Sequence, residues 1–370
     1  MSIAAELPVP PATPDPVDPL LEVRDLHTWF DTPRGMVRAV DGVSFTLRRG
    51  ASIGIVGESG SGKTVLSRSI MNLLPKKAAV PASGEVLFEG RDLRPMSSKQ
   101  MRSYWGPQMA MVFQDPMTSL NGVVKIGRQI TEGLRQHLDL SRQDADAEAV
   151  RLLTSVGIPA PERRLGEYPH QLSGGMRQRV TIAIALACGP KLLMADEPTT
   201  ALDVTVQAQI LDLLARQQAE RSMGMVLVTH DLGVVANRTD DIAVMYAGQI
   251  VEKASTRTLF RRMRHPYTEA LMRCIPRVEN PSHTRLDAIP GRPPDLAALP
   301  VGCRFAPRCR YAQPECLAEN PPLFSDEPGH EYRCFFPVGT SAGAEALERN
   351  ERAGSTAAGT TMDLLTKASA

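Results

Sequence analysis

Residues 57–64 have the sequence "GESGSGKT", which fits the pattern G-x-x-x-x-G-K-[ST] and decides the class of fold. The apolar run "ASIGIV" precedes it and the helical pattern "VLSRSIMNLL" follows it, so the stretch is expected to join a strand to a helix. Glycines let backbone N–H groups turn toward phosphate oxygens, and the helix N-terminus adds a positive dipole end. A flexible Gly/Ser connector is the alternative, but the flanking elements favour a phosphate-binding loop. The predicted phosphate-binding residues are Gly57, Ser59, Gly60, Ser61, Gly62, Lys63 and Thr64.

Charged and hydroxyl groups near this loop predict nucleotide chemistry. Lys63 is expected to bring its charge to the β- and γ-phosphates, and Thr64 to offer a hydroxyl to Mg²⁺. The apolar strand "KLLMADEP" (191–198) ends in two carboxylates. Asp196 is predicted to hold Mg²⁺ through its water shell, and Glu197 to polarise a water for in-line attack. An acidic pair after a strand is more often a solvated helix start, but the phosphate loop favours the functional interpretation.

Two further polar residues follow apolar strands. His230 ends the strand "GMVLVTH", and Gln114 follows the strand in "MVFQDP". Because the carboxyl ends of parallel strands share one edge of a sheet, both side chains are expected near Glu197. His230 is predicted to contact the γ-phosphate, and Gln114 the metal or the attacking water. A structural role is the alternative for the histidine.

A second glycine-rich segment, "LSGGMRQR" (172–179), opens a predicted helix with Ser173, Gly174 and Gly175. Backbone N–H groups at a helix N-terminus bind anions, so this segment is a second potential phosphate site. An ordinary helix start, with Ser173 as the N-cap, is the alternative. Two phosphate-binding segments in one chain are explained if the second serves a nucleotide held by another subunit.

Composition and element pattern set the class of the chain. A net charge of +1 over 370 residues gives no field that attracts nucleic acid. The longest apolar stretch is far shorter than the roughly 20 residues of a membrane-spanning helix. Strands alternate with helices, which favours an α/β fold with a mostly parallel sheet, an antiparallel N-terminal layer and a helical insert. The Pro-rich N-terminus lacks the features of a secretion signal.

As a set, the motifs resemble the ATP-binding subunits of ABC transporters. The phosphate loop, Gln114, "LSGGM", "MADEP", "TALD" (200–203) and His230 occur in the family order over about residues 21–260. The resemblance implies an ABC-type P-loop nucleotide-binding domain with a RecA-like parallel sheet core, an antiparallel β subdomain and a helical insert. A non-transport ABC protein and a P-loop kinase are less consistent with one cassette that carries "LSGG".

The family resemblance also implies roles for single residues. Two ATP molecules would lie between two cassettes, with the phosphate loop of one facing the signature serine and glycines of the other. Glu197 would be the catalytic carboxylate, His230 the switch histidine and Asp203 part of the dimer seam. Met176 stands where the family usually has glutamine, but Ser173 and both glycines are intact.

The detailed sequence of the chain resembles the D-type ATPase of oligopeptide and dipeptide importers. The resemblance includes two C-terminal segments, "HPYTEAL" (265–271) and "GCRFAPRC" (302–309). This implies an F-type ATP-binding subunit as heterodimer partner, two transmembrane permeases and an external substrate-binding protein, at the cytoplasmic face of the inner membrane. Peptides are the expected substrate; nickel, glutathione, opines or sugars are the alternatives.

The predicted units are a disordered tail (1–19), an ATP-binding domain (20–260) with a helical subdomain (about 117–188), a small Cys-rich C-terminal extension (261–338) and a second disordered tail (339–370).

In such cassettes an aromatic ring stacks on the adenine. Phe30 is the candidate, with its neighbour Trp29 as a second possibility, because both precede "RAVDGVSF". A core aromatic on an edge strand is an equal alternative.

Four cysteines, Cys303, Cys309, Cys316 and Cys334, lie in the extension of a chain expected in the cytosol, where thiols stay reduced. Their spacing of x5, x6 and x17 matches neither a zinc hairpin nor the commoner ferredoxin runs, so it predicts a metal site without naming the metal. Ligation would help to fold a segment that is short of large apolar residues. Free thiols and Zn²⁺ remain alternatives. The family resemblance implies a [4Fe–4S] cluster.

The extension is predicted to be a separate unit, so the ATP site is expected to bind nucleotide without it. Three arginines among the cysteines, Arg304, Arg308 and Arg310, are expected to offset the negative charge of the thiolates.

Overall fold

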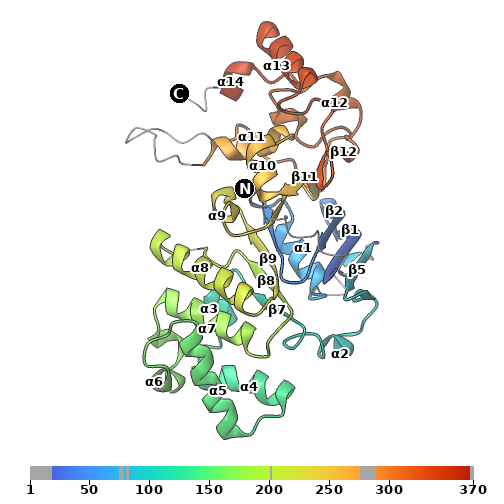
Figure 1. Cartoon of the computed structure of the whole chain (residues 1–370). Helices are drawn as coiled ribbons and strands as arrows, with labels where there is room; N and C mark the ends of the chain where they lie inside the picture. Colours follow the sequence, from blue (N-terminus) through green and yellow to red (C-terminus); the bar gives the residue numbers. More distant parts are fainter. Residues whose placement is uncertain (1–18, 75–78, 81–82, 201, 276–287, 367–370) are drawn as a thin grey trace, which may run out of the picture.

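The computed structural model describes residues 19–74, 79–80, 83–200, 202–275 and 288–366 (Figure 1). All but one residue of the predicted N-terminal tail therefore lie outside the described part. Two sheets and a helical insert build the cassette, and the Cys-rich extension lies at the end of the molecule opposite the insert. Within the described ranges, no helix combines the length and the hydropathy needed to cross a bilayer.

The larger sheet has the order β12-β13-β11-β10-β3-β9-β8-β7. Its parallel part consists of continuous apolar strands, as expected where both faces of a sheet are covered. These five strands are β3 (Ser52–Val56), β7 (Met109–Val112), β8 (Leu192–Asp196), β9 (Gly224–Thr229) and β10 (Asp241–Tyr246). Three antiparallel strands extend the sheet: β11 (Gln249–Ser255), β12 (Phe324–Glu327) and β13 (His330–Tyr332).

This sheet separates two hydrophobic cores. Along β9, Met225 and Leu227 point into the core shared with the helical insert, whereas Val226 and Val228 point into the core beneath the smaller sheet. Side chains alternate between the faces of a strand, so one apolar run can serve both cores. The carboxyl ends of these strands are thereby held rigidly at one edge, where the polar residues of the site lie.

The smaller sheet is antiparallel and covers one face of the larger one. It consists of β1 (Leu21–Thr32), β2 (Gly35–Leu47), β4 (Ala79–Val80), β5 (Glu85–Phe88) and β6 (Arg91–Asp92). Helix α1 (Lys63–Ile70) packs between the two sheets, and the short α2 (Ser98–Met101) follows β6 along the chain. The cassette architecture predicted from the motifs is therefore present.

Helices form the insert and the remaining face. The insert contains α3 (Pro116–Ser119), α4 (Ile126–Leu138), α5 (Arg142–Ser155), α6 (Pro161–Leu165), the 3₁₀ turn η1 (Pro169–Gln171) and α7 (Gly174–Leu186). Serine side chains cap two of these helices: Ser141 accepts from the N–H of Asp144, and Ser173 from that of Met176. Outside the insert lie α8 (Val204–Glu220) and α9 (Leu232–Val235).

The extension continues the cassette and is not a separate unit. Its strand β13 pairs with β11, and Phe305 and Cys309 belong to the same hydrophobic core as the insert. Helix α10 (Thr256–Arg262) crosses the predicted boundary at residue 260. The extension itself contains α11 (Pro266–Arg273), the 3₁₀ turn η2 (Ala306–Arg308) and α12 (Pro314–Ala318).

The predicted disorder of residues 339–370 is wrong for the described part of that segment. It forms α13 (Ser341–Ala353) and α14 (Met362–Thr366), which lie over the extension (Figure 1). Thr340 caps α13, Ala346 is fully buried, and the Asn350 amide donates to the carbonyls of Arg310 and Ala312. The composition is poor in large apolar residues, but capping and tertiary hydrogen bonds order the helix.

Candidate nucleotide site

The phosphate loop passes so close to two strands that only glycine fits at two of its positions. A Cβ atom on Gly57 would lie 2.1 Å from the Met245 carbonyl oxygen on β10. One on Gly62 would lie 2.0 Å from the Ala39 carbonyl oxygen on β2, and Gly62 has a φ of 104°. The buried Ser61 hydroxyl has no hydrogen-bond partner among the described residues. A buried unpaired hydroxyl in this loop is suited to donate to a phosphate oxygen.

Lys63 is held at the mouth of the loop. Its Nζ donates to the carbonyls of Gly57 (2.7 Å) and Glu58 (2.9 Å) and lies 3.8 Å from a carboxylate oxygen of Glu197. Burial lowers the pKa of this lysine, and the nearby carboxylates of Glu197 and Asp196 oppose that shift. The ammonium group is thus buried beside the loop, where an incoming phosphate can accept from it.

Three residues are predicted to bind Mg²⁺: Thr64 and Asp196 contact each other, and the third, Gln114, donates to Glu197. The Thr64 hydroxyl donates to Asp196 Oδ1 over 3.3 Å, and Asp196 is almost fully buried. Burial raises the pKa of this carboxyl to about 6, and the Thr64 hydrogen bond opposes the shift. A bound divalent cation would favour the ionised form instead. A hydroxyl and a carboxylate are the oxygen ligands that Mg²⁺ prefers, so this pair fits the ion.

Glu197 is the centre around which the predicted catalytic residues gather. Its Oε2 accepts from the Gln114 amide (2.9 Å) and the Thr200 hydroxyl (3.0 Å), and lies 3.6 Å from His230 Nδ1. The interaction with His230 is the largest influence that lowers the pKa of Glu197, and it raises the pKa of His230 in turn. The carboxylate is therefore ionised and able to accept a proton.

The backbone at Glu197 is strained. Its φ is 46°, and its N–H donates to the Val228 carbonyl on the neighbouring strand β9. A non-glycine residue in this region costs of order 1–3 kcal/mol, and such residues cluster at functional sites.

Thr200 was missed in the sequence, although it stands three residues after Glu197 in "DEPTTALD".

Ser173, Gly174 and Gly175, the signature segment, lie at the N-terminus of α7. Ser173 and Gly174 are exposed, and a Cβ on Gly175 would lie 2.8 Å from Val206 on α8. Asp203 caps α8 by accepting from the Val206 N–H over 2.9 Å. The signature segment and Asp203 thus occupy the N-termini of two helices in contact.

The two aromatic candidates for adenine stacking differ in their contacts. Trp29 donates from its indole to Asp41 (3.1 Å), and the Arg38 guanidinium lies 5.0 Å from its ring centre. Phe30 is half-buried on β1, paired in register with Val37. One face of the Trp29 ring is therefore covered, and Phe30 stays the first candidate with Trp29 as the second.

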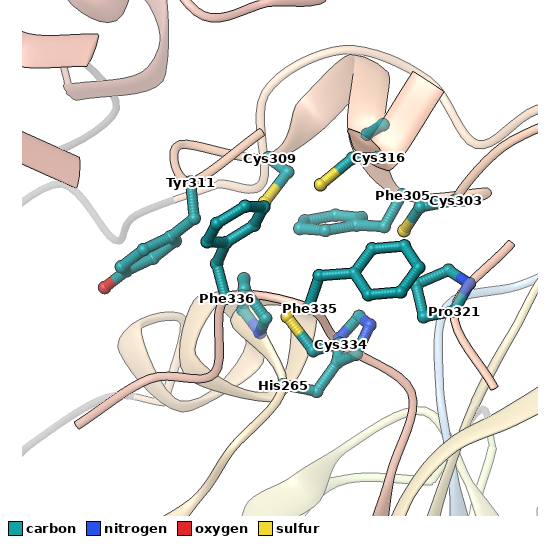
Figure 2. A pocket seen from close by; sticks show the side chains of 12 residues that line it. His265, Cys303, Phe305, Cys309, Tyr311, Cys316, Pro321, Cys334, Phe335 and Phe336 are labelled. Atoms are coloured by element: carbon teal, nitrogen blue, oxygen red, sulfur yellow. The ribbon is translucent and has the colours of Figure 1, made fainter. Parts of the chain in front are cut away.

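The four cysteines of the extension line one cavity (Figure 2). Aromatic rings share this space with the sulfur atoms, among them those of Phe305, Phe335 and Phe336. The six cysteines of the chain, all within the described ranges, form no disulfide. Within those ranges no three His, Cys, Asp or Glu side chains are close enough to hold a single metal ion. The spacing therefore brings four thiols to one place without the tight contact that one ion requires.

Two of the three arginines pair with carboxylates of the cassette. Burial raises the pKa of the Cys303 thiol, and the charge of Arg304 opposes that shift, as predicted for this arginine. Arg308 pairs with Glu58 of the phosphate loop, and Arg304 pairs with Asp41 on β2. Arg310 lies 3.5 Å from Glu351 on α13. Arg304 and Arg308 thus connect the extension to the cassette, and Arg308 brings the extension into contact with the phosphate loop.

Comparison with known proteins assigns the family. A family model described as ABC transporter matches residues 40–200, and one described as oligopeptide/dipeptide transporter, C-terminal region, matches residues 251–316. The oligopeptide transport ATP-binding protein OppD of Bacillus subtilis is 52% identical over 84% of this chain and 87% of its own length. The chain belongs to the ABC transporter ATPases. The OppD protein of Salmonella typhimurium is 46% identical over 88% of this chain and 96% of its own.

Solved ABC cassettes have the same fold. A dimeric, post-hydrolysis structure of the cassette MJ0796 bound to ADP and Pi superposes with a TM-score of 0.58, at 25% identity, covering 64% of this chain and 99% of the other. Part of the cbiONQ transporter complex, cbiO1 of Clostridium perfringens, has a TM-score of 0.55 at 27% identity over 66% of this chain and 91% of its own. The ABC ATPase described here therefore hydrolyses ATP through the cassette fold.

Replacing Lys63 with Ala is expected to weaken binding of ATP by this ABC ATPase at least about 30-fold, because a buried charge that donates to phosphate is lost. Titration with a fluorescent ATP analogue measures the change. Lys253→Ala is the matched control, since Lys253 on β11 pairs with Glu331 over 2.8 Å outside the site. Unchanged affinity in the Lys63 variant would contradict the role given to this residue.

Proposed function

We propose that this ABC ATPase energises the uptake of di- and oligopeptides through partner permeases. The observation that carries the proposal is the 46–52% identity with OppD proteins along most of the chain, including the C-terminal region that the oligopeptide/dipeptide transporter model matches. ATP binding closes two cassettes on each other, and hydrolysis with release of phosphate reopens them. This two-state motion drives alternating access in the permeases.

The assembly proposed here contains a second, F-type ATP-binding subunit as heterodimer partner, two transmembrane permeases and an external substrate-binding protein. The chain lies at the cytoplasmic face of the inner membrane as a peripheral subunit. The exposed Ser173 and Gly174 support a partner cassette, because they are free to face a nucleotide held by another chain. In this arrangement the signature segment and Asp203 act at the nucleotide of the partner.

Within the chain we assign roles to the residues that meet at the carboxyl edge of the sheet. The phosphate loop and Lys63 hold the phosphates, while Thr64 and Asp196 hold Mg²⁺, which would neutralise phosphate charge. Glu197 accepts the proton of the attacking water, supported by the 2.9 Å contact that orients its carboxylate against Gln114. His230 contacts the γ-phosphate, and Phe30 stacks on the adenine.

The four thiols of the extension hold a [4Fe–4S] cluster in this proposal. Their common cavity supports it, because all four thiols line the same space and thiolates are the ligands of such clusters. The cluster would supply ligation energy that folds residues from about 300 to 335, with no redox step required. Aromatic rings around the thiols exclude water from the site.

Assembly is tested by the ATPase rate of the purified chain alone and after co-expression with its partners. We expect the isolated chain to be slower by roughly 10²-fold, since each site lacks the donors of a second signature segment. The control is a complex whose partner cassette has both its signature serine and its phosphate-loop lysine replaced, which should fall back to the rate of the isolated chain. Full activity from a strictly monomeric preparation at high dilution would contradict the two-cassette arrangement.

The transported substrate is tested by uptake of labelled peptides into vesicles that contain the whole complex. We expect ATP-dependent accumulation of di- or oligopeptides, which unlabelled peptide competes away. Accumulation of Ni²⁺ or a sugar in place of peptide would contradict the proposal. The ATPase assignment does not depend on this outcome.

A further inference from the structure

We propose that Arg308 of the Cys-rich extension is a positioning residue for ATP binding, which acts by clamping Glu58 of the phosphate loop. It follows that the affinity for ATP depends on the folded state of the segment around Cys303 and Cys309. The proposal concerns the nucleotide site and holds whatever the transported substrate or the ligand of the thiols. Four contacts between the extension and the cassette carry it.

The first observation is a two-pronged ion pair between segments 250 residues apart in the chain. Arg308 Nη1 lies 2.6 Å from Glu58 Oε2, and Nη2 lies 2.9 Å from Oε1. The side chain of Arg308 is only 3% exposed and that of Glu58 is 26% exposed. A bidentate pair with little water around it fixes both the place and the orientation of the carboxylate.

Every donor of the Arg308 guanidinium is used. Besides Glu58, the group donates to the Tyr246 hydroxyl over 3.3 Å and to the carbonyls of Ile289 (3.1 Å) and Pro290 (2.8 Å). A guanidinium has five N–H donors in a rigid plane, and this site provides an acceptor for each. Lysine has neither the geometry nor the number of donors to replace it here.

Glu58 connects this clamp to Lys63, the phosphate-binding lysine. It is the second residue of the phosphate loop, and its carbonyl accepts from Lys63 Nζ over 2.9 Å. Its backbone N–H donates to the Tyr267 hydroxyl on α11 over 2.8 Å. The side chain, the N–H and the carbonyl of one loop residue are therefore all held, two of them by residues at or beyond position 267.

An aromatic cluster keeps these groups in place. The ring of Phe305, which lies between Cys303 and Arg308 in the chain, is 5.3 Å from the rings of both Tyr246 and Tyr267. The two tyrosine rings are 4.5 Å apart. Phe305 also lines the cavity of the four thiols (Figure 2). One ring therefore contacts both the cavity and the tyrosines that bind Arg308 and Glu58.

A second arginine supports the same loop from the other side. Arg304, next to Cys303, donates to the Ala247 carbonyl and to Asp41 Oδ2. The adjacent Gly248 N–H donates to the Ser61 carbonyl of the phosphate loop over 2.9 Å. The turn between β10 and β11 therefore connects Arg304 to the loop as Arg308 connects to Glu58.

Removal of Arg308 would leave a carboxylate unpaired beside the site where the nucleotide phosphates bind. That charge would repel the phosphates, and the loop would lose one of its fixed points. We expect the affinity for ATP to fall about tenfold, within the usual range of coupling between two sites. The rate at saturating ATP should change much less, because the groups around Glu197 make no contact with Arg308 among the contacts that the structure describes.

The test measures the affinity of the full-length chain for a fluorescent ATP analogue with Mg²⁺ in four variants. Arg308→Gln should bind about tenfold more weakly, and Arg308→Lys should lie between it and the parent. Arg310→Gln is the matched control and should bind as the parent does, because Arg310 pairs with Glu351 away from the loop. The double variant Glu58→Gln with Arg308→Gln should bind no more weakly than Arg308→Gln alone, because both changes remove the same contact.

Each result decides the proposal. Parental affinity in Arg308→Gln would overturn it outright. Weaker binding in the double variant than in Arg308→Gln would also overturn it, because the two residues would then contribute independently and Arg308 would not act through Glu58. Alkylation of the four thiols, compared between single and double variants, reports the folded state of the extension independently of nucleotide binding.

Discussion

Glu197→Gln is expected to abolish ATP hydrolysis while ATP binding persists. Glutamine keeps the shape of the side chain and can still meet Gln114 and Thr200, but it cannot accept a proton from the attacking water. Loss of a general base costs about 10²- to 10⁴-fold in rate. Affinity should be retained because the phosphate loop and Lys63 are unchanged.

The measurement is phosphate release by the complex of this chain with its partner subunits. The partner cassette should carry its own phosphate-loop Lys→Ala change, so that the remaining hydrolysis comes from the site built on Glu197. Glu220→Gln is the matched control, since Glu220 is an exposed carboxylate at the end of α8 that accepts from Gln217 over 3.0 Å. Hydrolysis at the parental rate in Glu197→Gln would remove this residue from the catalytic role.

Changing any one of Cys303, Cys309, Cys316 or Cys334 to Ser is expected to lose the cluster and unfold the extension. Protein purified without oxygen should be brown and hold about four iron and four acid-labile sulfide per chain, and each variant should lose both. In the proposal, ligation energy holds the fold of this segment, so limited proteolysis of the variants should cut between about residues 300 and 335.

The same variants should bind ATP more weakly, by about the factor expected for Arg308→Gln, because Arg308 directly precedes Cys309. Cys188→Ser and Cys274→Ser are the matched controls, since both thiols lie outside the cavity. They should keep the colour, the protease resistance and the affinity for ATP.

Metal analysis separates the possible outcomes. Stoichiometric zinc without sulfide would contradict the cluster, and the thiols would hold a single ion after a rearrangement of the cavity. Absence of any metal from protein kept anaerobic throughout would contradict ligation altogether. Neither result would affect the Arg308 proposal, which is tested with all four cysteines present.

The sequence by itself determined the cassette and most of the residues of the nucleotide site. Each of these sites follows an apolar strand that can be recognised in the local sequence. They are the loop at 57–64, the carboxylates after "KLLMA" and the histidine after "GMVLVT". Parallel strands end at one edge, so their local positions suffice to predict that Gln114, Glu197 and His230 meet. Thr200 was missed because a threonine in a loop carries no pattern of its own.

The tertiary structure decided which surfaces meet over long distances in the chain. Nothing near Arg308 or Arg304 in the sequence indicates that their partners are Glu58 and Asp41, which are 250 and 263 residues away. An arginine beside a cysteine can offset a thiolate or pair with any carboxylate that the fold brings close. The pairing of β13 with β11 and the packing of Phe305 bring these arginines to their carboxylate partners.

Order in the last segment was also decided by tertiary contacts. Small residues alone do not stabilise a short helix in water, so composition predicted disorder after residue 338. Packing of Ala346 and the hydrogen bonds of Asn350 to the backbone of the extension stabilise α13 instead. Local sequence patterns therefore predict sites that are built from residues close in the sequence. Contacts between distant segments depend on the packing of the whole chain, so they cannot be predicted from local patterns.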